Sequence, residues 1–176
     1  MAGGILSLDL GRMTGWAVAN RSAISAWPAG RFLLGRTPQR PAILCGTFTI
    51  GPTGLPHGDY YDRFAKWLDD MLTVHGPDAV VFEAAIPHHG GQEAARRAFG
   101  KIAVVDLLCH RRGVKAVREV ANNTVKKAFT GNGRAEKPAM IAACHDRGWN
   151  PPDHNAADGC AILECGVRVL KHGETL

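Results

Sequence analysis

The sequence lacks several features that define well-known classes of protein. It has no apolar run long enough to cross a bilayer, and Asp9 and Gly11 interrupt the first hydrophobic segment before a secretory leader can form. No internal repeat or low-complexity stretch is visible. The five cysteines include no C-x-x-C pair, so their spacing fits no common zinc knuckle. We therefore expect a cytoplasmic protein with reduced thiols, no membrane partner and no structural zinc.

The composition is that of an ordinary globular chain. Its 176 residues are 45% hydrophobic, which is enough to bury a core and predicts one domain over residues 1–176. Lysine and arginine number 21 against 16 acidic residues, so the net charge of +5 permits a polyanionic partner without requiring one. Residues 21–42 are rich in arginine, proline and glycine, which predicts an exposed insertion.

The order of apolar segments predicts an α/β fold. Strands are expected within residues 4–11, 12–20, 42–50, 78–86 and 114–120, and helices within 58–76, 90–113, 123–129, 136–147 and 154–171. Three strands in succession favour antiparallel hairpins, whereas the last two follow helices and should add in parallel. We expect a mixed five-stranded sheet flanked by helices.

Carboxylates stand where this fold could gather them. Asp9 and Glu83 lie near the ends of two apolar strands, where a buried acid is costly unless it is paired or bound to metal. Either could instead cap a turn or pair with arginine. In "PPDHNAADGCAI", Asp153 and Asp158 could bind metal, or could serve as a helix N-cap and a first-turn acid. If the last helix crosses neighbouring first and fourth strands, Asp9, Glu83 and Asp158 would form a site for Mg²⁺, with Mn²⁺ as a substitute.

The stretch "TGNGRAEK", residues 130–137, joins two predicted helices. It is either an ordinary solvated turn or a docking place for an anion. Gly131 and Gly133 would let the backbone approach a phosphate with unbonded N–H groups, and Arg134 and Lys137 would add positive charge. Lys137 could also stabilise charge that develops on a scissile phosphate.

Four segments together resemble a known family. "LSLDLGRMTGWAV", "VVFEAAIP", "TVKKAFTGNGRAEKPAMIAA" and "PPDHNAADGCAI" are similar, in that order, to the signature segments of the RuvC family of Holliday junction resolvases, most closely its phage and prophage branch. The resemblance runs from Ile5 to about Leu163. It implies an RNase H-like fold, a homodimer, and metal-dependent hydrolysis of phosphodiesters in four-way junctions and other branched double-stranded DNA.

The resemblance also implies roles for individual residues. The catalytic set would be Asp9, Glu83, Asp158 and Lys137, and the metal ligands would be Asp9, Glu83, Asp153 and Asp158. Phosphates would meet Lys126, Lys127, Gly131, Gly133, Arg134 and Lys137. The sequence departs from the family at the usual fourth ligand, three residues before Asp158, where it has Asn155. Asp153 has the better ligand chemistry and His154 the better helical phase, so both remain candidates. In the family the long helix within 90–113 makes the dimer contact.

Three other functions are compatible with parts of this pattern. An RNase H-like nuclease could act on RNA, flaps or forks instead of junctions. A junction-binding protein could have lost catalysis, since Asn155 and Ala156 stand where acids are common. An actin-like ATPase also opens with D-x-G, but this chain lacks a second such phosphate loop. His88 and His89 fall where resolvases place a junction-probing loop, and could stack on bases or be ordinary loop residues.

Overall fold

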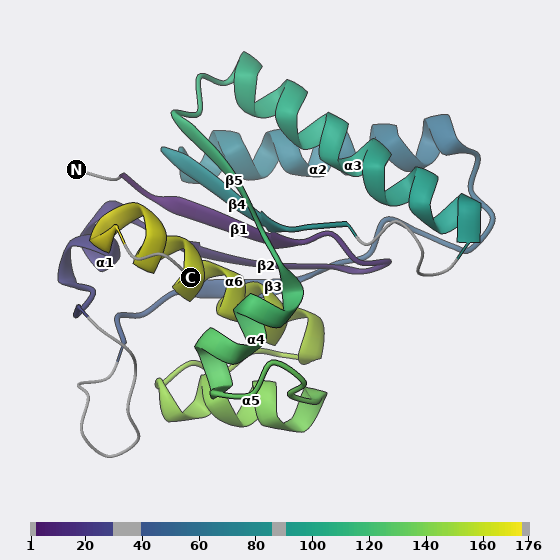
Figure 1. The fold of residues 1–176 in the computed structure, drawn as a ribbon. Helices are drawn as coiled ribbons and strands as arrows, with labels where there is room; N and C mark the ends of the chain where they lie inside the picture. The colour runs from purple at the N-terminus through teal and green to yellow at the C-terminus, as the bar shows by residue number, and fades with distance from the viewer. Residues whose placement is uncertain (1–2, 30–39, 86–90, 174–176) are drawn as a thin grey trace.

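A mixed β-sheet forms the centre of the molecule (Figure 1). The computed structural model describes residues 3–29, 40–85 and 91–173, which leaves His88 and His89 outside the described residues. Within those ranges the sheet has five strands in the order β3-β2-β1-β4-β5. They are β1 (Ile5–Asp9), β2 (Thr14–Ala19), β3 (Leu44–Phe48), β4 (Ala79–Glu83) and β5 (Ala116–Val120). The first three strands are antiparallel, and β4 and β5 run parallel to β1, which confirms the predicted sheet.

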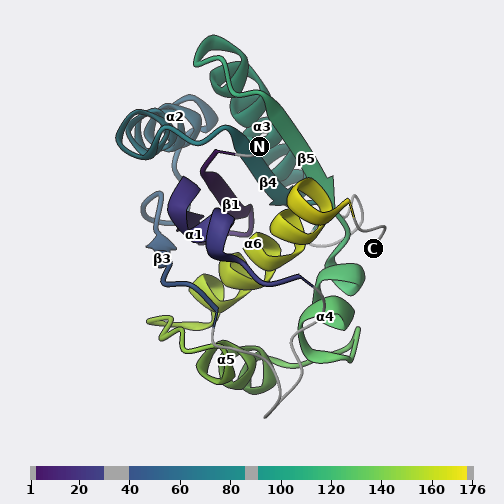
Figure 2. The same ribbon diagram turned by 90° about the vertical axis from the view of Figure 1, so that its left-hand side faces the viewer.

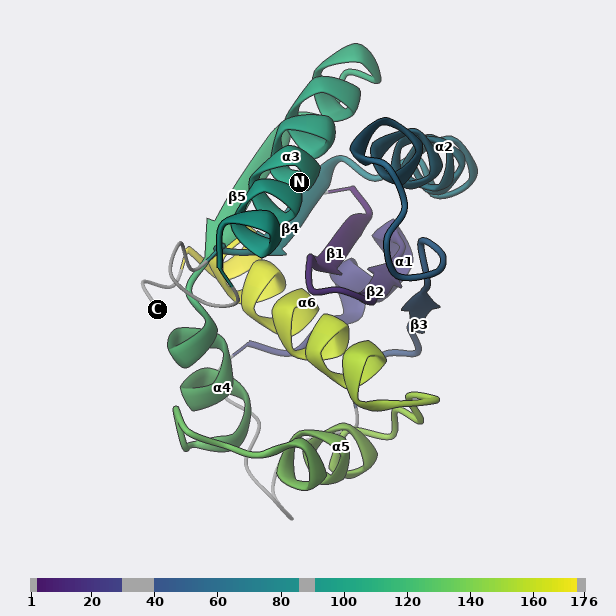
Figure 3. The same cartoon turned by 90° about the vertical axis from the view of Figure 1, so that its right-hand side faces the viewer.

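Helices cover the sheet on both faces. They are α1 (Arg21–Ala26), α2 (His57–His75), α3 (Gly91–Arg111), α4 (Asn122–Thr130), α5 (Lys137–Asp146) and α6 (His154–His172). Figure 2 shows α2 and α3 on one side of the sheet and α6 on the other. In Figure 3, α6 lies between the sheet and the α4–α5 pair. No helix in the described part of the chain is long and apolar enough to span a membrane.

The alternation of side chains along the strands decides which residues face which helix. Leu6 and Leu8 of β1 belong to the core under α2 and α3, whereas Ile5 belongs to the core under α6. The same alternation in β4 sends Val80 towards α2 and α3, and Val81 towards α6. Because side chains alternate with a period of two, the odd-numbered ends of both strands point towards α6. The residues at those two ends are Asp9 and Glu83.

Helix α6 sits unusually close to the sheet. The hydroxyl of Ser7 on β1 donates a hydrogen bond to the carbonyl of Gly159 over 2.7 Å. A methyl group built on Gly159 would lie 2.8 Å from backbone atoms of Trp16 on β2, so only glycine allows this approach. The helix is buried along most of its length, from Ala156 to Arg168. Its position on the sheet is therefore fixed, and so is the position of every side chain it carries.

The described parts of residues 21–42 mix exposed positions, such as Arg21, Ser22 and Ser25, with buried ones. Arg21–Ala26 forms α1, and Ile24, Trp27 and Arg40 are buried. Arg40 reaches the carboxylate of Glu164 on α6, and Trp27 packs against Trp149 with ring centroids 5.6 Å apart. These contacts with distant residues explain why three side chains of this arginine- and proline-rich segment are buried. Residues 30–39 lie outside the described residues.

Candidate active site

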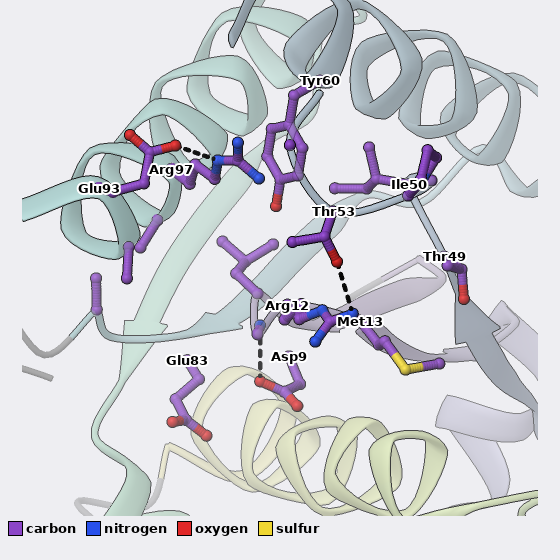
Figure 4. A pocket seen from close by; sticks show the side chains of 18 of the residues that line it. Asp9, Arg12, Met13, Thr49, Ile50, Thr53, Tyr60, Glu83, Glu93 and Arg97 are labelled. Carbon is purple, nitrogen blue, oxygen red and sulfur yellow. Dashed lines mark hydrogen bonds and ion pairs between the residues drawn. The ribbon is translucent and has the colours of Figure 1, made fainter. Parts of the chain in front are cut away.

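Three carboxylates meet at one edge of the sheet. Asp9 ends β1 and Glu83 ends the neighbouring parallel strand β4, where Leu8 pairs with Phe82 one residue earlier. Both acids occupy the odd-numbered positions that face α6, and Asp158 lies in the first turns of that helix. The predicted gathering of Asp9, Glu83 and Asp158 is thus present, and Figure 4 shows the Asp9 and Glu83 side chains together.

Burial raises the pKa values of all three acids, and neighbouring carboxylates raise those of Asp9 and Glu83 further. Burial, and then the charges of Glu83 and Asp158, raise the pKa of Asp9 from 3.8 to about 7, against smaller lowering effects from the Gly11 N–H and from Lys101. Burial and Asp158 also raise the pKa of Glu83, although the Asn122 amide donates it a hydrogen bond of 2.8 Å. Burial raises the pKa of Asp158 as well. Asp9 therefore keeps its proton to a higher pH than an ordinary aspartate does.

The donor set fits a hard divalent cation. All three groups are carboxylates, the ligand type that Mg²⁺ and Mn²⁺ prefer, and a cation among them would relieve the repulsion that raises their pKa values. Over residues 3–29, 40–85 and 91–173, however, no group of three or more histidine, cysteine, aspartate or glutamate side chains has a ready-made metal-binding geometry. The three acids lie on neighbouring elements, but in the described part of the chain their carboxylates do not form a ready-made coordination shell.

Asp153 is engaged elsewhere. Its carboxylate caps α6 by accepting a 2.9 Å hydrogen bond from the Ala156 N–H, and accepts another of 2.6 Å from the Thr47 hydroxyl on β3. Partial burial alone would raise its pKa, but these hydrogen bonds lower it overall. The N-cap alternative is therefore confirmed. Asp153 is not among the charges that shift the pKa values of Asp9, Glu83 and Asp158.

His154 lies nearer the other acids. The ammonium group of Lys137, at the start of α5, is 2.9 Å from its Nε2 atom. His154 and Lys137 both act to lower the pKa of Asp158, and so does Lys126 on α4. Lys126 also acts on Glu83. Two of the predicted phosphate-binding lysines therefore face the carboxylates, and His154 holds one of them there.

The other predicted phosphate contacts lie further out. Lys127 and Arg134 are exposed and do not influence the pKa values of the three acids. The N–H of Gly131 is not unbonded as expected, because it donates to the Lys127 carbonyl over 3.0 Å and ends α4 in a left-handed conformation. The N–H of Arg134 likewise donates to the Asn132 side chain. Gly133 sits so close to α4 that an added methyl group would lie 3.2 Å from the Asn123 carbonyl. The turn at residues 130–137 therefore exposes its cationic side chains, whereas the backbone N–H groups of Gly131 and Arg134 already have hydrogen-bond partners.

A cleft of about 690 Å³ opens beside Asp9 and Glu83 (Figure 4). Its walls come from the β1–β2 loop, residues 49–54 and the first turns of α3. On the wall away from the acids, the guanidinium of Arg97 lies 4.8 Å from the centre of the Tyr60 ring and pairs with Glu93. Arg12 lines the cleft next to Asp9. Nothing in the sequence singles out Arg12 or Tyr60, since neither belongs to a charged cluster along the chain.

One cation of α3 is buried. The side chain of Lys101 is 1% exposed, unlike those of its neighbours Arg96 and Arg97. Lys101 precedes the buried residues Val105 and Cys109 by four and eight residues, which is the spacing of one helix face. Helical phase could therefore have located it.

Comparisons with known proteins agree on one fold. No protein-family profile matches the chain. The crossover junction endodeoxyribonuclease RuvC of Methylorubrum populi is 30% identical over 139 residues, which cover 78% of this chain and 65% of that protein. The chain therefore spans slightly less than two thirds of this curated relative.

Solved structures are similar over nearly the whole chain. Thermus thermophilus RuvC has a TM-score of 0.72 at 20% identity, covering 97% of this chain and 96% of its own. The same protein in complex with a Holliday junction substrate has a TM-score of 0.66 at 16% identity, covering 95% and 94%. The yeast mitochondrial Holliday junction resolvase Ydc2 has a TM-score of 0.63 at 12% identity, covering 97% and 81%. The chain has the fold of these proteins, as the sequence predicted.

Proposed function

We infer that this chain belongs to the RuvC family of Holliday junction resolvases, and we propose that it is a metal-dependent endonuclease that cuts four-way junctions and other branched DNA. The observation that supports this most is the trio of Asp9, Glu83 and Asp158, whose pKa values are raised at the edge of a RuvC-like sheet. Lys126 and Lys137 face the trio. Negative groups that attract a cation, beside cations that attract a phosphate, suit phosphodiester hydrolysis.

Each group has a distinct part in this proposal. Asp9, Glu83 and Asp158 would hold Mg²⁺, or Mn²⁺ in its place. When bound, such ions activate water and stabilise the leaving oxygen of a phosphodiester. Lys137, oriented by His154 over 2.9 Å, would neutralise charge that develops on the scissile phosphate. Lys126 would hold the same phosphate against the acids.

The turn at residues 130–137 and the helices that it joins, α4 and α5, would hold the DNA. Lys127 and Arg134 are exposed on the same α4–α5 unit as Lys126 and Lys137, so the four cations would meet successive phosphates. Gly131 and Gly133 would shape the turn that carries Arg134. We propose a homodimer through α3, because two symmetric sites could nick equivalent strands of a four-way junction. We also propose a cytoplasmic location, where its five cysteines would stay reduced.

Cleavage of a labelled mobile four-way junction tests the proposal. The protein is incubated with the junction in Mg²⁺, Mn²⁺ or EDTA, beside linear duplex, a flap and an RNA–DNA hybrid. Paired symmetric nicks that need metal and spare the duplex are expected. Preferential cleavage of the hybrid or the flap would replace junction resolution with another RNase H-like activity.

Asp9→Asn is the matched loss-of-function variant. It should abolish nicking and leave junction binding in EDTA within about threefold of wild type, because it removes a ligand but no phosphate contact. Asp70→Asn removes an exposed carboxylate on α2 and should cut as wild type does. Retained nicking in Asp9→Asn would count against a role for Asp9.

A second candidate function is junction binding without catalysis. Two observations favour it: Asp153 is occupied as a helix cap, and no closed group of ligands exists among the described residues. Such a protein would bind the junction in every buffer and nick it in none. Asn155→Asp would then be the variant to test, since it restores an acid three residues before Asp158.

A further inference from the structure

Lys101 is a buried ammonium group with a specific set of partners. It lies near the middle of α3, is 1% exposed, and donates hydrogen bonds to the backbone carbonyls of Leu10 and Gly11. The Phe64 ring lies 5.9 Å from its nitrogen. Burial lowers the pKa of Lys101 to about 8, with Asp9 acting in the opposite direction. A lysine is seldom buried in this way, because an ammonium group loses its water unless polar groups replace it.

The partners of Lys101 lead directly to Asp9. Leu10 and Gly11 are the two residues that follow Asp9 where β1 ends, and they begin the β1–β2 loop. The N–H of Gly11 donates a 3.2 Å hydrogen bond to Oδ1 of Asp9. Lys101 thus binds two backbone carbonyls of this loop, and the Gly11 N–H of the same loop orients the Asp9 carboxylate. The contacts form a relay from α3, through the loop, to the acid.

This relay fixes an element that would otherwise have few constraints. Gly11, Arg12 and Met13 are exposed and belong to no strand. Arg12 makes a long contact of 3.4 Å with the Thr53 hydroxyl. Lys101 is the side chain that ties this loop to the buried face of α3. Without it, the Gly11 N–H could leave Asp9.

We propose that Lys101 is a positioning residue that fixes the Leu10–Gly11 turn and thereby aims the Asp9 carboxylate at the site shared with Glu83 and Asp158. This rests on the proposed function to the extent that the site binds a divalent cation. Residues that orient a metal ligand typically change metal affinity by about 10–100-fold when they are removed. The same size of effect is expected here.

The sign of the effect separates positioning from charge. Lys101→Met keeps the length and apolar stem of the side chain but removes its charge and its hydrogen bonds. If Lys101 acted only as a positive charge near the site, its loss would make cation binding tighter. If Lys101 orients Asp9, its loss makes cation binding weaker. A purely structural role would lower the melting temperature and leave the Mn²⁺ affinity of the folded protein unchanged.

The experiment measures Mn²⁺ binding to DNA-free protein by isothermal titration calorimetry. Lys101→Met is expected to weaken binding by about 10–100-fold and to slow single-turnover junction cleavage similarly. Its junction affinity in EDTA should stay within about threefold of wild type, because Lys101 is buried away from DNA. Lys66→Met, which alters an exposed lysine on α2, is the matched control and should change none of these quantities. Unchanged or tighter Mn²⁺ binding in a folded Lys101→Met protein would overturn the proposal.

Gly11→Pro tests the same relay from its other end. It removes the N–H that reaches Asp9 at an exposed position, so it carries the test even if Lys101→Met does not fold. It should also weaken Mn²⁺ binding, and the double variant should lose less affinity than the sum of the two single losses, since both changes break one relay. Unchanged Mn²⁺ affinity in Gly11→Pro, or additive losses, would overturn the relay.

The wild-type measurements separate this inference from the proposed function. A wild-type protein that binds Mn²⁺ through Asp9 but nicks no junction removes the proposed activity, while the calorimetry still decides the role of Lys101. A wild-type protein that binds no Mn²⁺ overturns both.

Discussion

At the scale of single residues, Asp9 shows how the fold alters an ordinary side chain. Its carboxyl group is placed under α6 beside two other acids, and burial with the charges of Glu83 and Asp158 raises its pKa to about 7. In the unfolded chain the same group would titrate near 3.8. The folded protein therefore holds this proton more tightly than the unfolded chain, and stability depends on pH.

The first prediction follows from that difference. The contribution of Asp9 to stability is complete below its unfolded pKa of 3.8 and is lost as the pH rises through its folded pKa of about 7. In EDTA, Asp9→Asn should therefore melt at a higher temperature than wild type at about pH 8, and this gain should shrink towards about pH 5. Each kcal/mol corresponds to about 2–4 °C for a chain of this size.

Thermal unfolding followed by circular dichroism at both pH values measures the gain. Addition of Mn²⁺ at the higher pH should raise the melting temperature of wild type and leave that of Asp9→Asn nearly unchanged. An equal difference between the two proteins at both pH values would mean that the pKa of Asp9 is not raised.

At the scale of elements, α6 decides whether the acids meet. The helix carries Asp158, and its close approach to β2 requires that Gly159 has no side chain. The small residues around Asp158 in "NAADGCAI" thus have a packing role. This stretch therefore supplies both the Asp158 carboxylate and the close contact of α6 with the sheet that positions it.

Gly159→Ala should separate α6 from the sheet. Its methyl group would lie 2.8 Å from the Trp16 backbone, which cannot yield as a flexible side chain could. We expect a loss of about 1–3 kcal/mol in the free energy of unfolding, measured by urea denaturation, together with reduced cleavage. Gly58→Ala is the matched control: it lies in α2 with nothing within 4 Å and should be neutral or slightly stabilising. Wild-type stability in Gly159→Ala would contradict the close packing.

The α4–α5 unit carries a separate prediction about DNA. Lys127 and Arg134 are exposed and lie outside the electrostatic reach of the acids, so they should affect binding more than catalysis. Lys127→Ala and Arg134→Ala should each weaken junction binding and reduce the slope of log affinity against log salt by about 1. Fluorescence anisotropy in EDTA over a salt series measures the slope. An unchanged slope would place that side chain away from the phosphates.

At the scale of the whole molecule, a buried ion network joins segments that are distant in sequence. Glu164 on α6 pairs with Arg147 at the end of α5 over 2.6 Å and with Arg40 over 3.3 Å. Arg147 also donates to the Phe129 carbonyl on α4 over 2.9 Å. The network therefore connects α4, α5 and the segment before β3 to the helix that carries Asp158.

Glu164→Gln should destabilise the whole fold. The change leaves two buried guanidinium groups without their shared carboxylate, and breaking such a pair typically costs about 3–5 kcal/mol. Against a total stability of about 5–15 kcal/mol, this loss should be evident in urea denaturation. Glu119→Gln, at an exposed position on β5, should change stability by less than about 0.5 kcal/mol. A small loss in Glu164→Gln would mean that the surrounding hydrogen bonds suffice to hold the arginines.

The sequence by itself determined the sheet and the placing of Asp9, Glu83 and Asp158. The direct succession of the first three strands predicted their antiparallel pairing, and the helices before the last two predicted that those strands add in parallel, as the sheet confirms. These properties depend on residues close together in the chain, so local patterns record them. The likeness of four short segments to a family of resolvases added the function that is proposed.

Only the tertiary structure decided what individual side chains touch. It assigned Asp153 to a helix cap and to Thr47, closed the Gly131 N–H within α4, and buried Lys101 and Arg40 against partners 90 or more residues away. A charged side chain becomes stable inside a protein only when distant groups replace its water, and nothing near it in sequence reveals whether they will. The acids of the site were therefore readable from the chain, whereas the groups that hold and orient them were not.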